Sequence, residues 1–500
     1  MLFSCRSHAA FQDFLRGRLP PLYYGDPPRL RSFSAALARV WLLDLDPAIH
    51  FLLSRYSHRG RPAFDPVDLL RSLVLMVFLE VFSITRWAEK LRSDRILAIL
   101  SGFAPGKTPA VGTFYSFFHR LWLQDQSVMA ERRLKLRAAR PKPRGKLKSG
   151  EKLRPKHPGI VKKLVKRAIL GRTFSHRPEW LIQWVFARCF VDQSVDLGLI
   201  PDPMALILSG DGTSIRSGSS PHGVKVCVCK KQGVYRCHCL RRFSDPDANW
   251  GWDSYREEFF YGYTGYSLTA AASQADLPFF TTVAQASRHD SVQGVVALAQ
   301  FRELHPKLAV AKGLWDSAHD VQDFYRLHRE WGIEPFISLN AKSLGQTRLA
   351  PAEMGDDGTP RCPAGIPMVR AGLDRARSRL RWRCPAASGK KAVCATPCSP
   401  SAYGRTVYTK PPDDPRLHPK TPRESEAWKT TFAKRSGSER LNKRSKWDYG
   451  LERYRVKSKE GWFWLSHLVN MNQHLDAWVK LAEKNGFKAW ERVLSRPAVA

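Results

Sequence analysis

Residues 206–213 read Leu206-Ile207-Leu208-Ser209-Gly210-Asp211-Gly212-Thr213, a short apolar run that ends at a carboxylate flanked by glycines. The apolar run has the length and composition of a buried β-strand, and Asp-Gly is typical of the turn that follows one. A carboxylate at that position is exposed at the rim of a sheet. The stretch therefore predicts a strand that ends at Asp211, and it leaves open whether this residue binds a divalent metal or is an ordinary turn residue.

The sequence on the C-terminal side of this stretch continues with strands and then alternates strands with helices. Aromatic and β-branched residues favour the strands, and the longer segments have helical length and composition. The predicted elements are strands at 259–270 and 279–286, a helix at 290–305, a strand at 308–315, a helix at 321–331 and a strand at 334–339. This order predicts an α/β fold with a mixed sheet covered by helices.

Asp316 repeats the arrangement of Asp211, because it directly follows the apolar run 308–315. Asp316 is either a second strand-end carboxylate or the N-cap of the helix that follows, and Asp320 is an alternative residue for that cap. Joined to Glu439, the two strand-end aspartates form a possible three-carboxylate metal site.

One short frame near the C-terminus carries charge at helical spacing: Phe432, Arg435, Glu439 and Lys446. At about 100° per residue these positions fall within roughly 60° of one another on a helix, on one face. A carboxylate between two cations suits a metal that grips a phosphodiester, and the same residues also suit a solvated helix surface. Gly437 costs about 1 kcal/mol inside a helix, which favours a helix that starts after Phe432 and leaves the shared face firm for Glu439 and Lys446.

Composition narrows the class of protein. The chain of 500 residues is 43% hydrophobic, with 16 Trp and 26 Phe, which indicates a folded protein of several domains. Its 81 basic against 45 acidic residues give a formal charge of +36, so we expect a polyanionic partner, nucleic acid before an acidic membrane surface. No apolar run is long enough for a membrane span, and residues 1–6 lack a secretion signal, so we expect a reducing compartment.

The N-terminal third combines a helical region with a basic segment. Residues 69–80 and 84–100 have helical patterns, and Thr108-Pro109 offers an N-cap and a first-turn proline for a helix over 111–122. Between residues 132 and 172 there are 17 Lys or Arg and one acidic residue. This segment is predicted to be a solvated linker, a contact for the DNA backbone, or both.

Eight cysteines form two groups that suit structural zinc better than catalysis. Cys227, Cys229, Cys237 and Cys239 lie on a predicted hairpin, where residues two apart point to the same side. Cys362, Cys384, Cys394 and Cys398 resemble a zinc ribbon within a segment rich in Gly, Pro and charge. For the first group, buried free cysteines are an equal alternative to zinc.

Two histidines and two aromatic residues are further candidates for a functional role. His289 and His319 each lie beside an aspartate, and we expect them to cap helices. Trp447 and Tyr454 either stack on an extruded base or, as is commoner, pack in the core.

The sequence resembles the DDE-type insertion-sequence transposases, whose catalytic glutamate lies in a Tyr-x2-Arg-x3-Glu-x6-Lys motif. The frame that ends at Lys446 matches this motif at every spacing, with Phe432 in place of tyrosine. The other similar blocks are Asp211-Gly212-Thr213, Tyr261-Gly262-Tyr263-Thr264-Gly265-Tyr266, Arg288-His289-Asp290, Asp316-Ser317-Ala318-His319-Asp320 and the strand at 334–340. The resemblance covers roughly residues 200–490, and the helical N-terminal part is similar to the family's end-binding region.

The resemblance implies an RNase H-like core in which Asp211, Asp316 and Glu439 bind two Mg²⁺ (or Mn²⁺) ions. It implies hydrolytic strand cleavage at the end of a mobile element, followed by attack of the freed 3′-OH on target DNA. By the same resemblance, Arg435 and Lys446 hold the terminal phosphates. Phe432 lacks the phenol of the family's tyrosine and retains stacking or packing.

These interpretations divide the chain into five parts. They are a helical, DNA end-binding domain (1–130), a basic linker (131–175), the first part of an RNase H-like catalytic core (176–340), an insertion with a possible zinc ribbon (341–430) and C-terminal catalytic helices with Glu439 (431–500).

The family resemblance sets the expected partners and location. We expect double-stranded DNA as the partner, as terminal inverted repeats and as target, a homodimer in the synaptic complex, no membrane, and a nucleoid-associated location in a prokaryotic cytoplasm. Two alternatives stay open: a catalytically inactive DNA-binding derivative of a transposase, and a structure-selective nuclease on the same fold.

Overall fold

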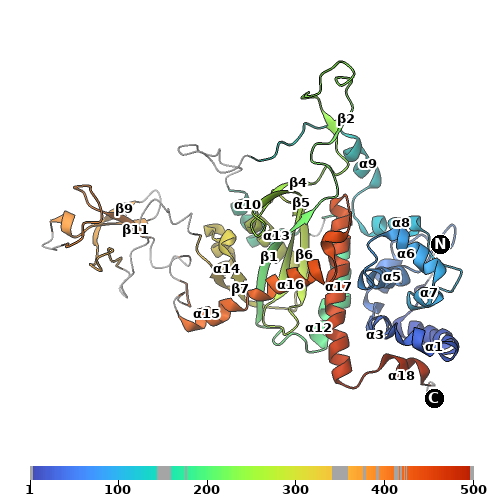
Figure 1. Cartoon of the computed structure of the whole chain (residues 1–500). Helices are drawn as coiled ribbons and strands as arrows, with labels where there is room; N and C mark the ends of the chain where they lie inside the picture. Colours follow the sequence, from blue (N-terminus) through green and yellow to red (C-terminus); the bar gives the residue numbers. More distant parts are fainter. Residues whose placement is uncertain are drawn as a thin grey trace. The chain divides into compact units, whose positions relative to one another are not determined.

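The computed structural model describes residues 4–143, 159–174, 177–340, 359–374, 379–389, 394–409, 416, 419–421, 423 and 425–495. The fold is mixed α/β, with a mixed sheet flanked by helices, as predicted (Figure 1). The chain divides into two units: Met1–Lys312 with Lys434–Ala500, and Gly313–Ala433. Part of the predicted basic linker and part of the predicted insertion lie outside the described residues.

Helices form the N-terminal part of the first unit. Their bounds are α1 His8–Gly25, α2 Pro27–Arg31, α3 Ser34–Leu42, the 3-10 helix η1 Asp46–Ala48, α4 Ile49–Leu53, α5 Pro66–Phe78, α6 Ile84–Ser93, α7 Arg95–Leu100, α8 Val111–Leu121 and α9 Gln126–Leu134. Helix α5 is buried along nearly its whole length. Asp65 begins it, because its carboxylate accepts the N–H of Val67 at 2.9 Å and Pro66 occupies the first helical position.

Two predicted helices differ in their bounds. The segment 84–100 is two helices, because the carboxylate of Asp94 accepts the N–H groups of Ile96 and Leu97 and starts a new helix there. The predicted cap of α8 is also wrong. Ala110 occupies that position and no side chain caps the helix, so Thr108 lies two residues too early.

A buried ion pair lies inside the N-terminal helices. The guanidinium of Arg71, which is fully buried on α5, donates to the carboxylate of Asp68 one turn earlier and lies 3.6 Å over the ring of Phe11. Arg6 approaches the same carboxylate at 3.2 Å. Gly102 permits this arrangement, since its φ is +92° and a Cβ there would lie 2.3 Å from an oxygen of Asp68. Phe11, Arg6 and Gly102 therefore surround the ion pair.

The sheet of the first unit is built around the long strand β5, Glu258–Ala270, which pairs with three other strands. The strands are β1 Leu206–Arg216, β4 Asn249–Asp253, β5 Glu258–Ala270, β6 Pro278–Gln285 and β7 Val310–Trp315. Their order is β4-β5-β1-β7, and β6 also pairs with β5. Strand β5 is antiparallel to β1, with Asp211 opposite Ser267, and it is antiparallel to β4 and β6. Strand β7 begins in the first unit and ends in the second.

Helices cover this sheet. Helix α13, Asp290–Leu304, packs on β1, β5 and β6, and α10, Ile160–Ile169, packs on α13. Helix α10 lies within the segment that we predicted to be a basic linker. A second helical stretch comprises α11 Trp180–Phe186, the π-helix η2 Ala187–Val191 and α12 Asp192–Asp196. It packs on the long helix α17, Lys459–Lys484.

The long helix α17, Lys459–Lys484, joins the N-terminal helices to the sheet (Figure 1). On one side Asn472 donates to the carbonyl of Val74 in α5, and Asp476 pairs with Arg39 of α3. On the other side Asn470 donates to the hydroxyl of Thr281 in β6 at 2.7 Å. The remaining C-terminal elements of the unit are α16 Ser436–Trp447, the 3-10 helix η6 Leu451–Arg453 and α18 Ala489–Leu494.

A chain of buried hydrogen bonds crosses α17. Trp478 donates to the hydroxyl of Ser194 in α12, and this hydroxyl contacts Nδ1 of His474 at 2.7 Å. Nε2 of His474 contacts the carbonyl of Pro278 at 2.8 Å. Because a carbonyl only accepts, Nε2 carries the proton and Nδ1 accepts from the hydroxyl. The chain is therefore complete with a neutral imidazole.

We expect acid to destabilise the protein through these histidines. Burial lowers the pKa of His474 and of His467 to about 4, and Arg444 and His305 add to this effect at His474. A histidine of an unfolded chain titrates near pH 6.5, so between about pH 6.5 and 4 the unfolded chain binds more protons. The free energy of unfolding therefore decreases as the pH is lowered from about 6.5 to 4, by up to about 3 kcal/mol for each of the two histidines.

Urea denaturation at a series of pH values measures this effect. His474→Gln should reduce the number of protons taken up on unfolding, given by the slope of the unfolding free energy against pH, by about one. The same change at the exposed His50 should leave this slope unaltered. An identical pH dependence in wild type and His474→Gln would contradict the assignment.

The second unit contains the end of β7 and a separate small sheet. Its elements are the 3-10 helix η3 Ser317–His319, α14 Gln322–Glu330, β8 Glu334–Ile337, β9 Val369–Asp374, β10 Arg379–Arg383, the 3-10 helix η5 Ala386–Ser388, β11 Thr406–Thr409 and α15 Glu426–Ala433. Ser338 donates to the carbonyl of Trp315, beside β8. Strands β11, β10 and β9 form an antiparallel sheet in that order.

Candidate functional site

Asp211 lies in the middle of β1, half-buried, and not at a strand end as predicted. The strand continues through Gly212 to Arg216, because the antiparallel register with β5 holds the Gly-Asp-Gly segment in the sheet. The carboxylate of Asp211 accepts a hydrogen bond from the amide of Asn442, a residue of α16, at 2.9 Å. Asp211 is therefore held from a helix that lies more than two hundred residues further along the chain.

Helix α16 presents one face to β1. Glu439, Asn442 and Lys446 lie at offsets of 0, 3 and 7, which places them within roughly 60° of one another on the helix. Asn442 contacts Asp211, and Nζ of Lys446 donates to the hydroxyl of Ser214 in β1 at 3.1 Å. The predicted shared face of Glu439 and Lys446 is confirmed. The sequence reasoning missed Asn442, although its position one turn after Glu439 is visible in the spacing.

Phe432 does not share this helix. It belongs to α15, in the second unit, where its ring stacks on Trp428 with centroids 4.4 Å apart. Arg435 is the residue before α16 begins, and its guanidinium pairs with the carboxylate of Glu439. The side chain of Glu439 is 56% exposed. The four-residue frame is thus divided: Phe432 lies in α15, Arg435 directly precedes α16, and Glu439 and Lys446 lie in α16. The prediction that the helix of Glu439 starts after Phe432 is confirmed.

Gly437 is the second residue of α16 and lies against Asp276. A Cβ at this position would lie 2.6 Å from the carboxylate of Asp276. That carboxylate forms two hydrogen bonds with the guanidinium of Arg440, at 2.6 and 2.8 Å. Glycine therefore lets the first turn of α16 approach Asp276. The ion pair of Arg440 with Asp276 then holds this first turn, which also contains Glu439, in place.

Asp316 directly follows β7, as predicted, and it also caps the short helix η3. Its carboxylate accepts the N–H of Ala318 at 3.1 Å and contacts Nδ1 of the buried His319 at 2.6 Å. Asp320 is not a helix cap, because its carboxylate pairs with the guanidinium of Arg416 at 2.7 and 2.8 Å. Asp316 is thus oriented by two donors within the second unit.

The remaining predicted residues have clear positions. His289 caps α13, since its Nδ1 accepts the N–H of Ser291. Tyr454 is buried against Phe82 and belongs to the core. Trp447, at the end of α16, is 77% exposed.

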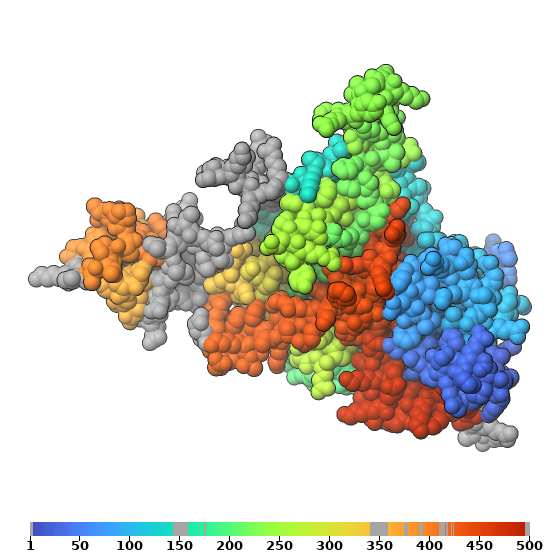
Figure 2. Space-filling view, in the orientation of Figure 1, coloured from blue at the N-terminus to red at the C-terminus, as the bar shows by residue number. Residues whose placement is uncertain are grey.

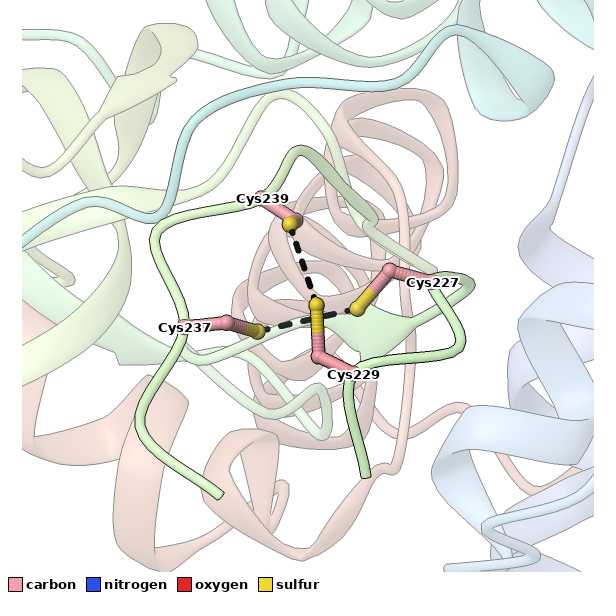
Figure 3. Close-up of side chains that lie close together, drawn as sticks. All are labelled: Cys227, Cys229, Cys237 and Cys239. Atoms are coloured by element: carbon pink, nitrogen blue, oxygen red, sulfur yellow. Dashed lines mark hydrogen bonds between the residues drawn. The ribbon is translucent and has the colours of Figure 1, made fainter. Parts of the chain in front are cut away.

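The first cysteine group converges on one point. Strands β2, Val224–Lys225, and β3, Arg241–Arg242, form a very short hairpin, and the cysteines lie in the loop between them. All four sulfur atoms lie within 4.8 Å of one another, and the pairs Cys227–Cys237 and Cys229–Cys239 are 3.6 and 3.5 Å apart (Figure 3). A tetrahedral zinc site with Zn–S bonds of about 2.3 Å has sulfurs about 3.8 Å apart.

The first group therefore has the donor set and spacing to bind a structural metal such as zinc. The pKa shifts within the group oppose one another. The backbone N–H of Cys229 and the neighbouring thiols lower the pKa of Cys227 to about 7, whereas hydrogen bonds with Cys239 and Cys227 raise that of Cys229 to about 12.

The second cysteine group shares a cavity. Cys362, Cys384, Cys394 and Cys398 all line a cavity of about 280 Å³ in the second unit, together with small residues such as Ala364 and Gly404. Among the described residues, only the first group has its sulfurs within 4.8 Å of one another. Zinc binding by the second group stays a prediction.

The charge of the chain and the contents of its sheet are unusual for a protein of this size. The chain carries a formal charge of +36, and its sheet holds a carboxylate beside a helix that is rich in cations. Within the described ranges no helix combines the length and the hydropathy that crossing a membrane demands.

Comparison with known proteins gives the more particular finding. Residues 33–120 match a family model described as Transposase domain (DUF772). The matched segment contains α3 to α8, with the buried pair of Asp68 and Arg71. No curated protein matches the chain. The family match supports a transposase, a DNA-processing enzyme with DNA as its partner.

Proposed function

We propose that this protein is a DDE-type DNA transposase, which cleaves DNA at the ends of a mobile element and transfers the 3′-OH strand to target DNA. The match of residues 33–120 to a transposase domain supports the class. The spacing of Arg435, Glu439 and Lys446 supports the DDE type. The sheet with flanking helices supports an RNase H-like core.

The observation that carries the proposal is the contact between α16 and β1. Asn442 of α16 donates to Asp211, and the same helix face carries Glu439 one turn away. The resemblance implies that Asp211 of β1 and Glu439 of α16 act together as metal ligands. The packing of α16 on β1 supports that pairing.

The proposed metal ligands are Asp211, Asp316 and Glu439. Carboxylate oxygens are the donors that Mg²⁺ prefers, and Mn²⁺ accepts the same set, so the residue types fit these ions. When bound, the metal ions supply activation of the attacking oxygen and stabilisation of the leaving oxygen.

The protein's own groups orient the ligands and the DNA. Asn442 holds the carboxylate of Asp211, and His319 with the N–H of Ala318 holds that of Asp316. In the proposed complex Arg435 exchanges Glu439 for a terminal phosphate, and Lys446 contacts a neighbouring one. Phe432 stacks or packs and forms no hydrogen bond there.

The proposed partners are double-stranded DNA, as terminal inverted repeats and as target, and a second copy of the chain that holds the other end. Holding two ends together requires a homodimer in the synaptic complex. The proposed location is the nucleoid in the cytoplasm of a prokaryotic cell.

An end-cleavage assay tests the function. Purified full-length protein is incubated with Mg²⁺ and a labelled duplex that carries the DNA flanking its coding sequence. We expect strand cleavage at the element's end and joining of that end to a second duplex. Binding without cleavage would replace the proposal by an inactive derivative, and cleavage without joining would replace it by a nuclease.

A further inference from the structure

The loop with the first cysteine group forms a small projecting element, residues 222–242, which we call the cysteine finger (Figures 1 and 2). We propose that the cysteine finger closes around one Zn²⁺ and that, once ordered, it binds the phosphate backbone of duplex DNA. The DNA part of this inference rests on the proposed function. The metal part does not.

The cysteine finger has no hydrophobic core to hold it. All of residues 222–242 are described, and none of them is buried. The paired strands β2 and β3 contribute two residues each. An isolated element of this size needs a metal or a disulfide to be stable. The four sulfur atoms that converge in the finger supply the ligands for such a metal.

The turn of the cysteine finger positions its thiols. The carbonyl of Cys229 accepts the N–H groups of Gln232 and Val234, and Gly233 has a φ of +79°, which reverses the chain between the two Cys-x-Cys pairs. Each pair contributes one sulfur to each close contact, Cys227 with Cys237 and Cys229 with Cys239 (Figure 3). These two distances are close to the sulfur separation of a tetrahedral zinc site, and all four sulfurs lie within 4.8 Å of one another.

The surface of the cysteine finger is strongly positive. Residues 222–242 include six Lys or Arg and two His, and no Asp or Glu. Arg241 is used inside the finger, because its guanidinium donates to the carbonyls of His222 and Cys237. The exposed cations are Lys230, Lys231, Arg236 and Arg242. Exposed cations without neighbouring carboxylates match a polyanion.

A second basic segment adjoins the base of the cysteine finger. The backbone of Arg137 exchanges two hydrogen bonds with that of Arg241, at 2.9 and 2.8 Å. This contact ties the segment 132–142, which has six Lys or Arg, to the base of the finger at residue 137. Arg132 pairs with Asp247, and Arg137 donates to the carbonyl of Pro246. Arg140 is anchored through the carbonyl of Pro246, 3.0 Å away. The two basic segments therefore meet at the base of the finger, and Lys135 and Lys142 add to its positive charge.

Zinc content tests the metal. The full-length wild-type protein should contain one more zinc ion per chain than the Cys229→Ser/Cys239→Ser variant, measured by elemental analysis of protein purified under reducing conditions. Equal zinc content would overturn the metal assignment. Cys227–Cys237 and Cys229–Cys239 disulfides in the native protein, detected by mass spectrometry, would also overturn it.

DNA affinity as a function of salt tests the contact. Lys230→Ala/Lys231→Ala leaves the thiols intact and should keep the zinc. If each lysine neutralises one phosphate, the slope of log K against log salt should fall by about 1.8, and affinity near 0.1 M salt should fall roughly 10- to 60-fold. The matched control is Lys480→Ala/Lys484→Ala, which removes two exposed lysines of α17 and should leave both quantities unchanged.

The outcomes separate this inference from the proposed function. Unchanged affinity and slope in Lys230→Ala/Lys231→Ala, together with end cleavage by wild type, would overturn the finger contact and leave the transposase standing. Failure of the wild type to bind duplex DNA at all would overturn both. Loss of affinity in the lysine variant but not in its control would support the finger contact whatever the cleavage assay gives.

Discussion

We expect Asp211→Asn to lower Mg²⁺-dependent strand cleavage by about 10³-fold while leaving DNA affinity within a factor of a few. Asparagine keeps the shape of the side chain and removes the charge that a metal ligand needs. The half-buried position and the contact with Asn442 limit any effect on folding. The measurement is single-turnover cleavage of an end-containing duplex. Glu439→Gln should behave in the same way.

Two further variants make this result specific. Asn442→Ala removes the group that holds Asp211 but no proposed ligand, so we expect a loss of about 10- to 100-fold and a higher Mg²⁺ concentration for half-maximal rate. Asp448→Asn, after the end of the same helix, should cleave like wild type. Normal cleavage by Asp211→Asn would remove this residue from the site.

We expect Asp68→Ala to lower the free energy of unfolding by about 3–5 kcal/mol. Burial raises the pKa of Asp68 and lowers that of Arg71, and the attraction between the two groups opposes both shifts. Removing the carboxylate leaves the guanidinium of Arg71 inside the protein, over the ring of Phe11, with the nearby cation Arg6. Urea denaturation followed by tryptophan fluorescence measures the loss.

The control for this prediction is an exposed pair. Asp13 contacts Arg16 at 2.7 Å with its side chain 69% exposed, so Asp13→Ala should change the free energy of unfolding by less than about 1 kcal/mol. The double variant Asp68→Leu/Arg71→Met should recover most of the stability, because an apolar pair leaves no buried charge. A small effect of Asp68→Ala alone would show that water reaches Arg71.

Parts of the fold that depend on local pattern could be predicted from the sequence. The strand β7 and the carboxylate after it follow from an apolar run and its end. By contrast, the length of β1 depends on pairing with β5, which is distant in sequence, and this pairing overrides the turn preference of Asp-Gly. The same applies to Asp94, since a cap inside an apolar pattern is recognised only when its side chain is seen to accept from the next turn.

The candidate site shows the same limit. Spacing on one helix placed Glu439 and Lys446 together, because helical geometry is local. The contact of Asn442 with Asp211 and that of Asp276 with Arg440 join segments more than 150 residues apart, and spacing carries no information about them. Gly437 looked like a weak point of a helix, and its reason is the carboxylate that it lets in.

Helix α17 has a consequence for how such proteins diversify. Its side chains contact α3 and α5 on one side and β6 on the other, so the N-terminal helices and the sheet share one framework. An N-terminal region exchanged alone between relatives would lose its partner surface. We therefore expect a chimera to fold stably only when the donor's α17 contact residues are transplanted with its N-terminal helices, as urea denaturation of chimeras with and without these residues would measure.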